Sequence, residues 1–375
     1  MRITSRGTVV AGRADTEYSS ACFPGACVLP SGRWLVTHRA APTKDSVASQ
    51  RTLLSWSDDE GQTWGDPVEP WAPPRIDGAR GALRAAHVTS LGPMSAVAVI
   101  YWVDVSGPSR PFFNEETEGL LDSRVLLSLT EDGGETWSDP ALVDTSPYDI
   151  PTPITGPLLA LANGDWALQF ETNKTYNDSS PWRHASVFML SADRGESWPE
   201  HVSVAADPAG RIFYWDQRPA VLPDGRVLDL FWTFDRETAE YLNIHARESR
   251  HHGRSWSDLW DTGVPGQPAP TVALPDGRLV MVYVDRTGTP RIMARISSDD
   301  GRSWPESTAT IIHGEAAESQ TEDKGSMQDA WSEMSRFSIG LPATAPLPGG
   351  DILVVYYAGP ETDVTDIRWA RLTSP

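Results

Sequence analysis

Cysteine is scarce in this sequence of 375 residues. Cys22 and Cys27 are its only two, too few for a disulfide framework. They also lack the histidine or cysteine companions that a zinc site requires. We therefore predict that both are small buried residues, and we expect no metal and no organic cofactor.

Long apolar runs are also missing. The N-terminal stretch MRITSRGTVVAGRADTEYSS has basic residues but no apolar core long enough for a signal peptide. No other segment approaches the length of a membrane span. The sequence thus predicts no membrane partner and a cytoplasmic location, although a secreted protein whose signal had been removed would give the same pattern.

Basic residues are outnumbered. Lysine and arginine total 31 against 51 acidic residues, which gives a formal net charge of -20. The summed field of such a chain repels phosphate backbones and anionic surfaces, so nucleic acid is excluded as a partner. The composition leaves the oligomeric state open.

A motif of eight residues, [ST]-x-D-x-G-x-[ST]-W, recurs along the chain and is called the box below. Copies stand at residues 57 to 64, 130 to 137, 191 to 198, 249 to 256 and 297 to 304. The fourth copy has His251 in the place of the aspartate. Serine, threonine and aspartate can hydrogen-bond turn amides, glycine permits the bend, and tryptophan can wedge between sheets. We predict that the boxes staple outer turns and take no part in chemistry.

A second repeat consists of two apolar strands around a tight turn. It stands at residues 26 to 38, 158 to 170, 220 to 232, 271 to 283 and 344 to 356, with a weaker copy at 85 to 102. Repeats of this kind indicate one all-β domain over residues 1 to 375, a six-bladed β-propeller. Residues 5 to 12 and 365 to 372 should pair in the last blade and close the ring.

Boxes on a sixfold hairpin repeat resemble the sialidase superfamily, over nearly the whole chain. The resemblance implies an exo-acting glycosidase on a propeller. In HRAAPTKDS, Arg39 and Asp45 match the family's arginine and the aspartate that serves as general acid/base. In YWDQRPAVLPDG, Asp216 stands where the family has a glutamate that activates a tyrosine nucleophile.

Two positions differ from the family pattern. Cys22-Phe23-Pro24 replaces an Arg-Ile-Pro segment whose arginine grips the substrate carboxylate, and Leu341 stands near the position of the tyrosine. A carboxylate is held best by several converging arginines. The arginines available for this are Arg84, Arg218, Arg286, Arg291 and Arg336. We therefore predict a sugar other than ordinary sialic acid, with a uronic or other acidic sugar if these arginines converge.

Polar residues just before each inner strand should point toward the propeller axis and form the pocket. Asp45 is predicted as the acid/base, Asp216 as the nucleophile or base, and Glu171 as the reserve carboxylate. The predicted substrate-binding residues are Arg39, Arg84, His87, Arg218, Gln267 and Arg336. The acidic segment 315 to 329 is predicted to be a loop over one face, with a role as a lid left open.

These residues favour an exo-acting glycoside hydrolase with paired carboxylates, acting on an oligosaccharide or glycoside. A polysaccharide lyase on the same scaffold is the first alternative and would depend on His87 and Tyr214. A carbohydrate-binding propeller without catalysis is the second. The fold alone does not choose among the three.

Overall fold

The computed structural model describes residues 1 to 107, 109 to 314 and 321 to 374. In these residues the regular secondary structure is almost entirely β-strand. Its helical elements are α1 (Met327–Arg336) and the short 3-10 turns η1 (Glu306–Thr308) and η2 (Pro348–Gly350). None of these helices is long and apolar enough to cross a membrane.

Five hydrogen-bonded sheets contain the strands. The largest has seven strands: β24 (Ile339–Pro346), β25 (Ile352–Glu361), β26 (Val364–Thr373), β1 (Arg2–Val10), β2 (Ser20–Val28), β3 (Trp34–Ala41) and β4 (Arg51–Ser57). A four-stranded sheet follows: β5 (Gly81–Ser90), β6 (Ala96–Asp104), β7 (Ser123–Thr130) and β8 (Ala141–Leu142). The next also has four strands: β9 (Leu159–Ala160), β10 (Trp166–Glu171), β11 (Ala185–Ser191) and β12 (Glu200–Ala206).

The remaining two sheets come from the middle of the chain. One comprises β13 (Ile212–Trp215), β14 (Ala220–Val221), β15 (Val227–Asp235), β16 (Glu240–Tyr241), β17 (Asn243–Ser249) and β18 (Trp260–Pro265). The other comprises β19 (Gln267–Pro268), β20 (Val272–Ala273), β21 (Leu279–Asp285), β22 (Arg291–Ser297) and β23 (Thr310–His313).

The sheets follow one another in a closed, propeller-like order. Strands of consecutive sheets touch, as in the contacts of β2 with β5, β9 with β14, and β15 with β19. The last sheet in the sequence returns to the first through contacts of β21 with β24. The prediction of an all-β propeller-like fold is therefore confirmed.

The prediction of six separate blades is wrong, because the backbone hydrogen bonds group the strands into five sheets. The reason lies at the junction of the two chain ends. Ser20 of β2 pairs in parallel with Thr365 of β26, and this single pair joins the last hairpin unit to the first. The Thr365 hydroxyl strengthens the junction, since it donates to the Ala21 carbonyl at 2.7 Å and accepts from the Ala21 amide at 2.9 Å.

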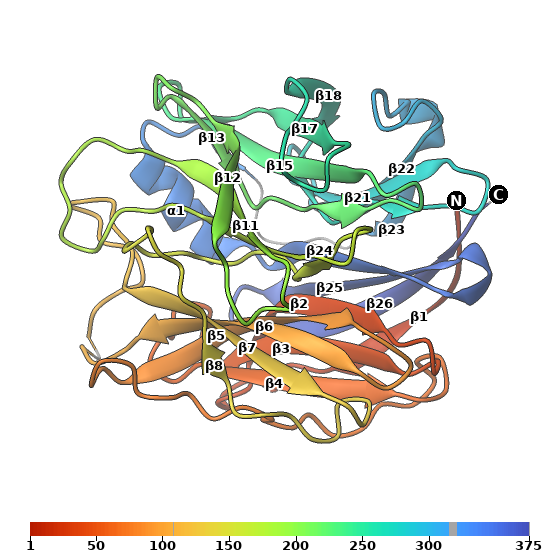
Figure 1. Cartoon of the computed structure of the whole chain (residues 1–375), viewed down its shortest axis with the longest axis horizontal. Coiled ribbons are helices and arrows are strands. Elements are labelled where there is room, and N and C mark those ends of the chain that lie inside the picture. The colour runs from red at the N-terminus through yellow and green to blue at the C-terminus, as the bar shows by residue number, and fades with distance from the viewer. Residues whose placement is uncertain (108, 315–320, 375) are drawn as a thin grey trace.

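The predicted pairing of the two terminal segments is confirmed. β1 runs antiparallel to β26, from Arg2 opposite Thr373 to Val10 opposite Ile367. The two ends of the chain consequently lie close together (Figure 1).

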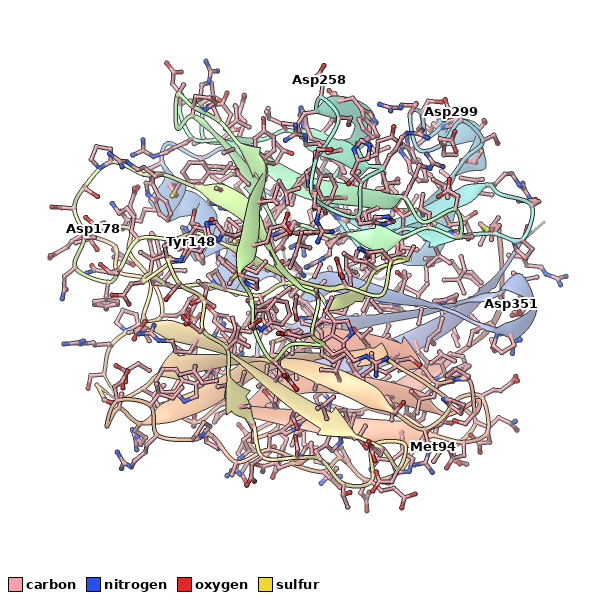
Figure 2. The ribbon with its side chains drawn as sticks, in the orientation of Figure 1. Met94, Tyr148, Asp178, Asp258, Asp299 and Asp351 are labelled. Atoms are coloured by element: carbon pink, nitrogen blue, oxygen red, sulfur yellow. The ribbon has the colours of Figure 1, made fainter. Side chains whose placement is uncertain are left out.

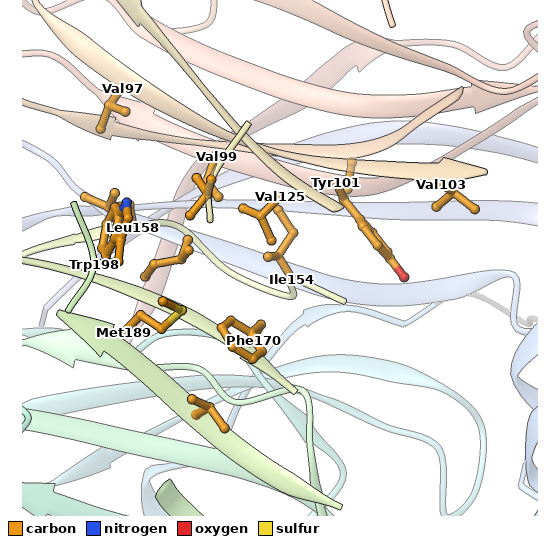
Figure 3. Close-up of a cluster of buried hydrophobic side chains, with 14 of the residues drawn as sticks. Val97, Val99, Tyr101, Val103, Val125, Ile154, Leu158, Phe170, Met189 and Trp198 are labelled. Carbon is orange, nitrogen blue, oxygen red and sulfur yellow. The ribbon is translucent and has the colours of Figure 1, made fainter. Parts of the chain in front are cut away.

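The core lies between neighbouring sheets. Figure 3 shows one such layer, in which Val97 and Val99 of β6 face Phe170 of β10 and Met189 of β11. All four side chains are fully buried. Strands in the middle of a sheet are covered on both faces, which explains the continuous apolar run AVAVIYWV in β6.

The four boxes that keep the aspartate form the same turn. In the first, Ser57 Oγ accepts from the Gly61 amide at 2.9 Å, and Asp59 accepts from the Thr63 amide at 2.8 Å and the Thr63 hydroxyl at 2.6 Å. In the last box, Asp299 makes the equivalent bonds to Ser303 at the outer edge of the molecule (Figure 2). The boxes thus close outer turns, in agreement with their predicted structural role.

Candidate functional site

A cavity of about 540 Å³ opens among the inner strands and the loops that precede them. Its lining includes most of the side chains singled out from the sequence: Asp45, Arg84, His87, Glu171, Asp216, Arg218 and Gln267. They come from every part of the ring, which explains why no local motif brings them together.

Two predicted substrate-binding residues do not line the cavity. Arg39 is fully buried in β3 and donates to Gln50 Oε1 at 2.7 Å and to the Ser46 carbonyl at 2.5 Å, so that it holds the loop after β3 in place. Arg336 ends α1, is largely exposed, and faces Glu322 at 3.4 Å. The rule that residues before an inner strand face the axis fails for Arg336 because a helix occupies this position.

That helix replaces part of the predicted acidic loop. Residues 315 to 320 of the segment lie outside the described residues. Ser326 caps the helix by accepting from the Asp329 amide, and Met327, Ala330 and Glu333 form its buried face. Since α1 contributes Gln328, Trp331 and Met334 to the cavity lining, this helix forms a wall of the site.

Glu171 and Asp216 lie next to each other in the cavity. Glu171 ends β10 and is only 4% exposed, and its Oε1 accepts from the amide of Gln217 at 3.3 Å. Burial and the neighbouring charge of Asp216 raise the pKa of Glu171 well above its ordinary value. Asp216 follows β13 with φ 49°, a left-handed conformation that turns it out of the strand.

Asp216 accepts one hydrogen bond and forms one ion pair through Oδ2. Gln267 Nε2 donates to this oxygen, and Arg218 Nη2 lies 3.6 Å from it. Gln267 is itself held by Arg286, whose Nη1 donates to Gln267 Oε1 at 3.0 Å. Asp216 therefore lies at the end of a hydrogen-bonded chain that begins at a buried guanidinium.

Asp45 is placed differently from the other two carboxylates. It lines the cavity from the loop after β3, where its side chain is exposed to solvent. The structure thus brings Glu171, the predicted reserve, together with the half-buried Asp216 and leaves Asp45 at the solvent-exposed part of the site.

Lys44 is a cavity residue that the sequence reasoning missed. Its ammonium donates to the carbonyls of Met334 at 2.8 Å and Phe337 at 2.5 Å, and lies 3.3 Å from the Tyr357 hydroxyl. Desolvation lowers the pKa of Lys44 to about 7. The only available signal was its position beside Asp45, which does not show whether the side chain turns inward.

Cations without a carboxylate partner face the cavity. Among the described residues, Lys44, Arg84 and Arg286 form no ion pair. Arg84 lies between the rings of Phe23 and Phe112, 4.9 and 4.1 Å from their centroids, and burial lowers its pKa to about 10. Flanking rings of this kind fix the plane of a guanidinium and leave its edge for a planar anion.

Aromatic rings cover part of the cavity. Phe113 stacks on Trp331 of α1 with ring centroids 4.8 Å apart and an interplanar angle of 15°. His87 lines the cavity too, and burial lowers its pKa to about 3, so its ring is neutral at physiological pH. Tyr214, the other residue invoked for a lyase, packs edge-on against Phe231 away from the cavity lining.

Solved structures match this fold over almost the whole chain. A protein of unknown function from Dyadobacter fermentans is 18% identical, with a TM-score of 0.74 and full coverage of both chains. The Hadza microbial sialidase Hz136 is 16% identical with a TM-score of 0.70, covering 98% of this chain and 68% of its own. The intramolecular trans-sialidase from Ruminococcus gnavus, solved with oseltamivir carboxylate, is 14% identical with a TM-score of 0.65, covering 98% of each chain. No curated protein matches the chain.

At such identities the structural matches establish the fold alone. The sequence itself carries the family assignment, because residues 97 to 345 match the BNR repeat-like domain family, and this is more than half of the chain. The chain therefore belongs to the BNR repeat-like domain family and has the fold of the sialidases.

Proposed function

We propose that the protein is an exo-acting glycoside hydrolase of the sialidase superfamily that removes a terminal acidic sugar other than ordinary sialic acid. One observation carries this proposal: the adjacent carboxylates of buried Glu171 and half-buried Asp216 share a sugar-sized cavity with cations that have no carboxylate partner among the described residues. In a chain of net charge -20, such a cationic cavity favours an anionic ligand.

The two carboxylates suit different roles in hydrolysis. Glu171, whose pKa is raised, would hold the proton and donate it to the leaving oxygen as the glycosidic bond breaks. Asp216, held as a hydrogen-bond acceptor, would act as the nucleophile or as the base that takes a proton from the attacking water. Glu171 thus takes the role that the sequence assigned to Asp45.

Recognition of the sugar would come from the cations and rings. Arg84 would offer donors along the edge of its guanidinium to a carboxylate, Lys44 would add a point charge, and Arg286, held by Gln267 and the Ile339 carbonyl, would contribute its positive field. Phe23 occupies the segment where the sialidases carry an arginine, and its ring packs on Arg84. The arrangement of the anion-binding groups therefore differs from that expected for sialic acid, which supports another acidic sugar.

A screen with aryl glycosides tests the proposal. The panel contains aryl uronides, neutral aryl glycosides, an aryl sialoside and acidic polysaccharides. We expect release of the aryl group from an acidic glycoside, and a fall in kcat of about 10²–10⁴ for both Glu171→Gln and Asp216→Asn, as for loss of an acid or base. Asp299→Asn in the last box is the control and should keep the activity.

Three other results would count against the proposal. Efficient release of sialic acid would show that the substrate assignment is wrong. An unsaturated product that absorbs in the ultraviolet would favour the lyase, for which neutral His87 remains an available base in the cavity. Binding of a glycan without any product would favour the non-catalytic propeller.

A further inference from the structure

Gln267 connects a cation to one carboxylate of the pair. It lies on β19, is only 3% exposed, and spans from Arg286 to Asp216. A guanidinium has donors only, so the side-chain atom that faces Arg286 at 3.0 Å must be the oxygen Oε1. The amide nitrogen Nε2 must consequently face Asp216.

The N–H of Gln267 faces Asp216 Oδ2 and therefore favours the ionised carboxylate. If that oxygen carried a proton, two donor groups would face each other. Glu171 accepts from the peptide amide that follows Asp216, so the two carboxyl groups interact closely. Two such groups resist simultaneous ionisation. At pH values below the raised pKa of Glu171 one proton therefore remains on the pair, and Gln267 discriminates between the two possible sites.

We propose that Gln267 is a positioning residue: its amide, oriented by Arg286, keeps Asp216 ionised and assigns the proton of the pair to Glu171. The catalytic meaning of this assignment rests on the proposed function. The orientation of the amide itself does not, because it follows from the hydrogen bonds of the protein alone.

The other groups around the pair do not make this choice. The charge of Arg218 acts on both carboxylates, at 3.6 Å from Asp216 and as a favourable charge near Glu171. Tyr357 lies within the field of Asp216 and Tyr101 within that of Glu171. Burial raises the pKa of both phenols, which keeps them uncharged. Gln267 differs from these groups because its Nε2 donates directly to Asp216 and its orientation is fixed by Arg286.

Carboxyl titration by ¹³C NMR tests this inference without any substrate. We compare the wild-type protein with Gln267→Met, which keeps the length of the side chain and removes the amide. Loss of a hydrogen bond to a charged group should raise the lower apparent pKa of the pair by about one pH unit or more. Gln328→Met is the matched control, since Gln328 lines the same cavity from the exposed side of α1. Superimposable titration curves for wild type and Gln267→Met would overturn the inference.

Arg286→Met provides a second route if Gln267→Met does not fold. Without Arg286 the amide can rotate, so the same apparent pKa should rise, and the double variant should shift it no further than the larger single change. In an active protein, the acidic limb of kcat/KM against pH should move in the same direction. A shift in the titration of a protein that cleaves no glycoside would disprove the proposed function and support the role of Gln267. Hydrolysis of a glycoside together with an unshifted titration would support the proposed function and disprove the role of Gln267.

Discussion

Among single residues, Lys44 most directly links the stability of this protein to pH. Its folded-state pKa of about 7 lies below the ordinary value of 10.5 because burial penalises the charge, with Arg286 and Arg39 opposing it further. Cys22, Asp45 and Tyr357 are the other groups around it. Between these two pKa values the unfolded chain holds one proton more than the folded protein. The unfolding free energy therefore rises with pH in this window.

We expect a rise of at most about 1.4 kcal/mol per pH unit between pH 7 and 9. From about pH 9 to 10.5 the buried thiol of Cys27, whose pKa is raised from 9.0 to about 12, offsets this rise, because there the folded protein keeps a thiol proton that the unfolded chain has lost. Urea unfolding at pH 7, 8 and 9 measures the slope. Lys44→Met and Lys44→Arg should both reduce it, because neither side chain loses a proton in this range. An undiminished slope in both variants would show that Lys44 is not the group responsible.

At the level of elements, the fourth box differs from the others by one residue, and replacing that residue with aspartate should stabilise the turn. His251 Nδ1 and Ser255 Oγ lie 2.6 Å apart, whereas the aspartate of the last box accepts from both the amide and the hydroxyl of Ser303. His251→Asp should restore the second hydrogen bond and raise the unfolding free energy by about 0.5–1.5 kcal/mol. His251→Asn, with one acceptor oxygen and no charge, should gain less. Thermal unfolding compares the two, and equal stability of wild type and His251→Asp would contradict the prediction.

The hairpins and boxes could be predicted from the sequence because their signals are local. TVALPDGRLVMVY predicts two strands around a Pro-Asp-Gly turn, and the structure has β20 and β21 there. α1 was missed since its acidic residues obscured the apolar spacing of Met327 and Ala330. The pairing of Glu171 with Asp216 depends on the distance between two sheets, which no local pattern encodes. The inward turn of Lys44 was missed for the same reason.

For the whole molecule, closure of the ring depends on close contact between β1 and β26. A Cβ on Gly7 would lie 2.7 Å from Trp369 Nε1, so only glycine fits at this point of the ladder. Gly7→Val should cost about 1–3 kcal/mol of unfolding free energy, as overpacking does. Thr8→Val, at the exposed neighbouring position, is the control and should change little. Urea unfolding of both variants would test this, and equal midpoints would show that β1 adapts without loss.

The β1–β26 ladder also constrains how the protein is made. A ribosome releases β1 first, yet its partner strand runs from Val364 to Thr373, so β1 must wait for almost the entire chain. Until then β26 is absent, and the backbone amides and carbonyls of β1 remain available to other strands. Pairing across such a sequence separation is also slow, because a very long loop has to close. The stage between emergence of β1 and completion of β26 is therefore the period in which newly synthesised chains are most exposed to intermolecular strand pairing.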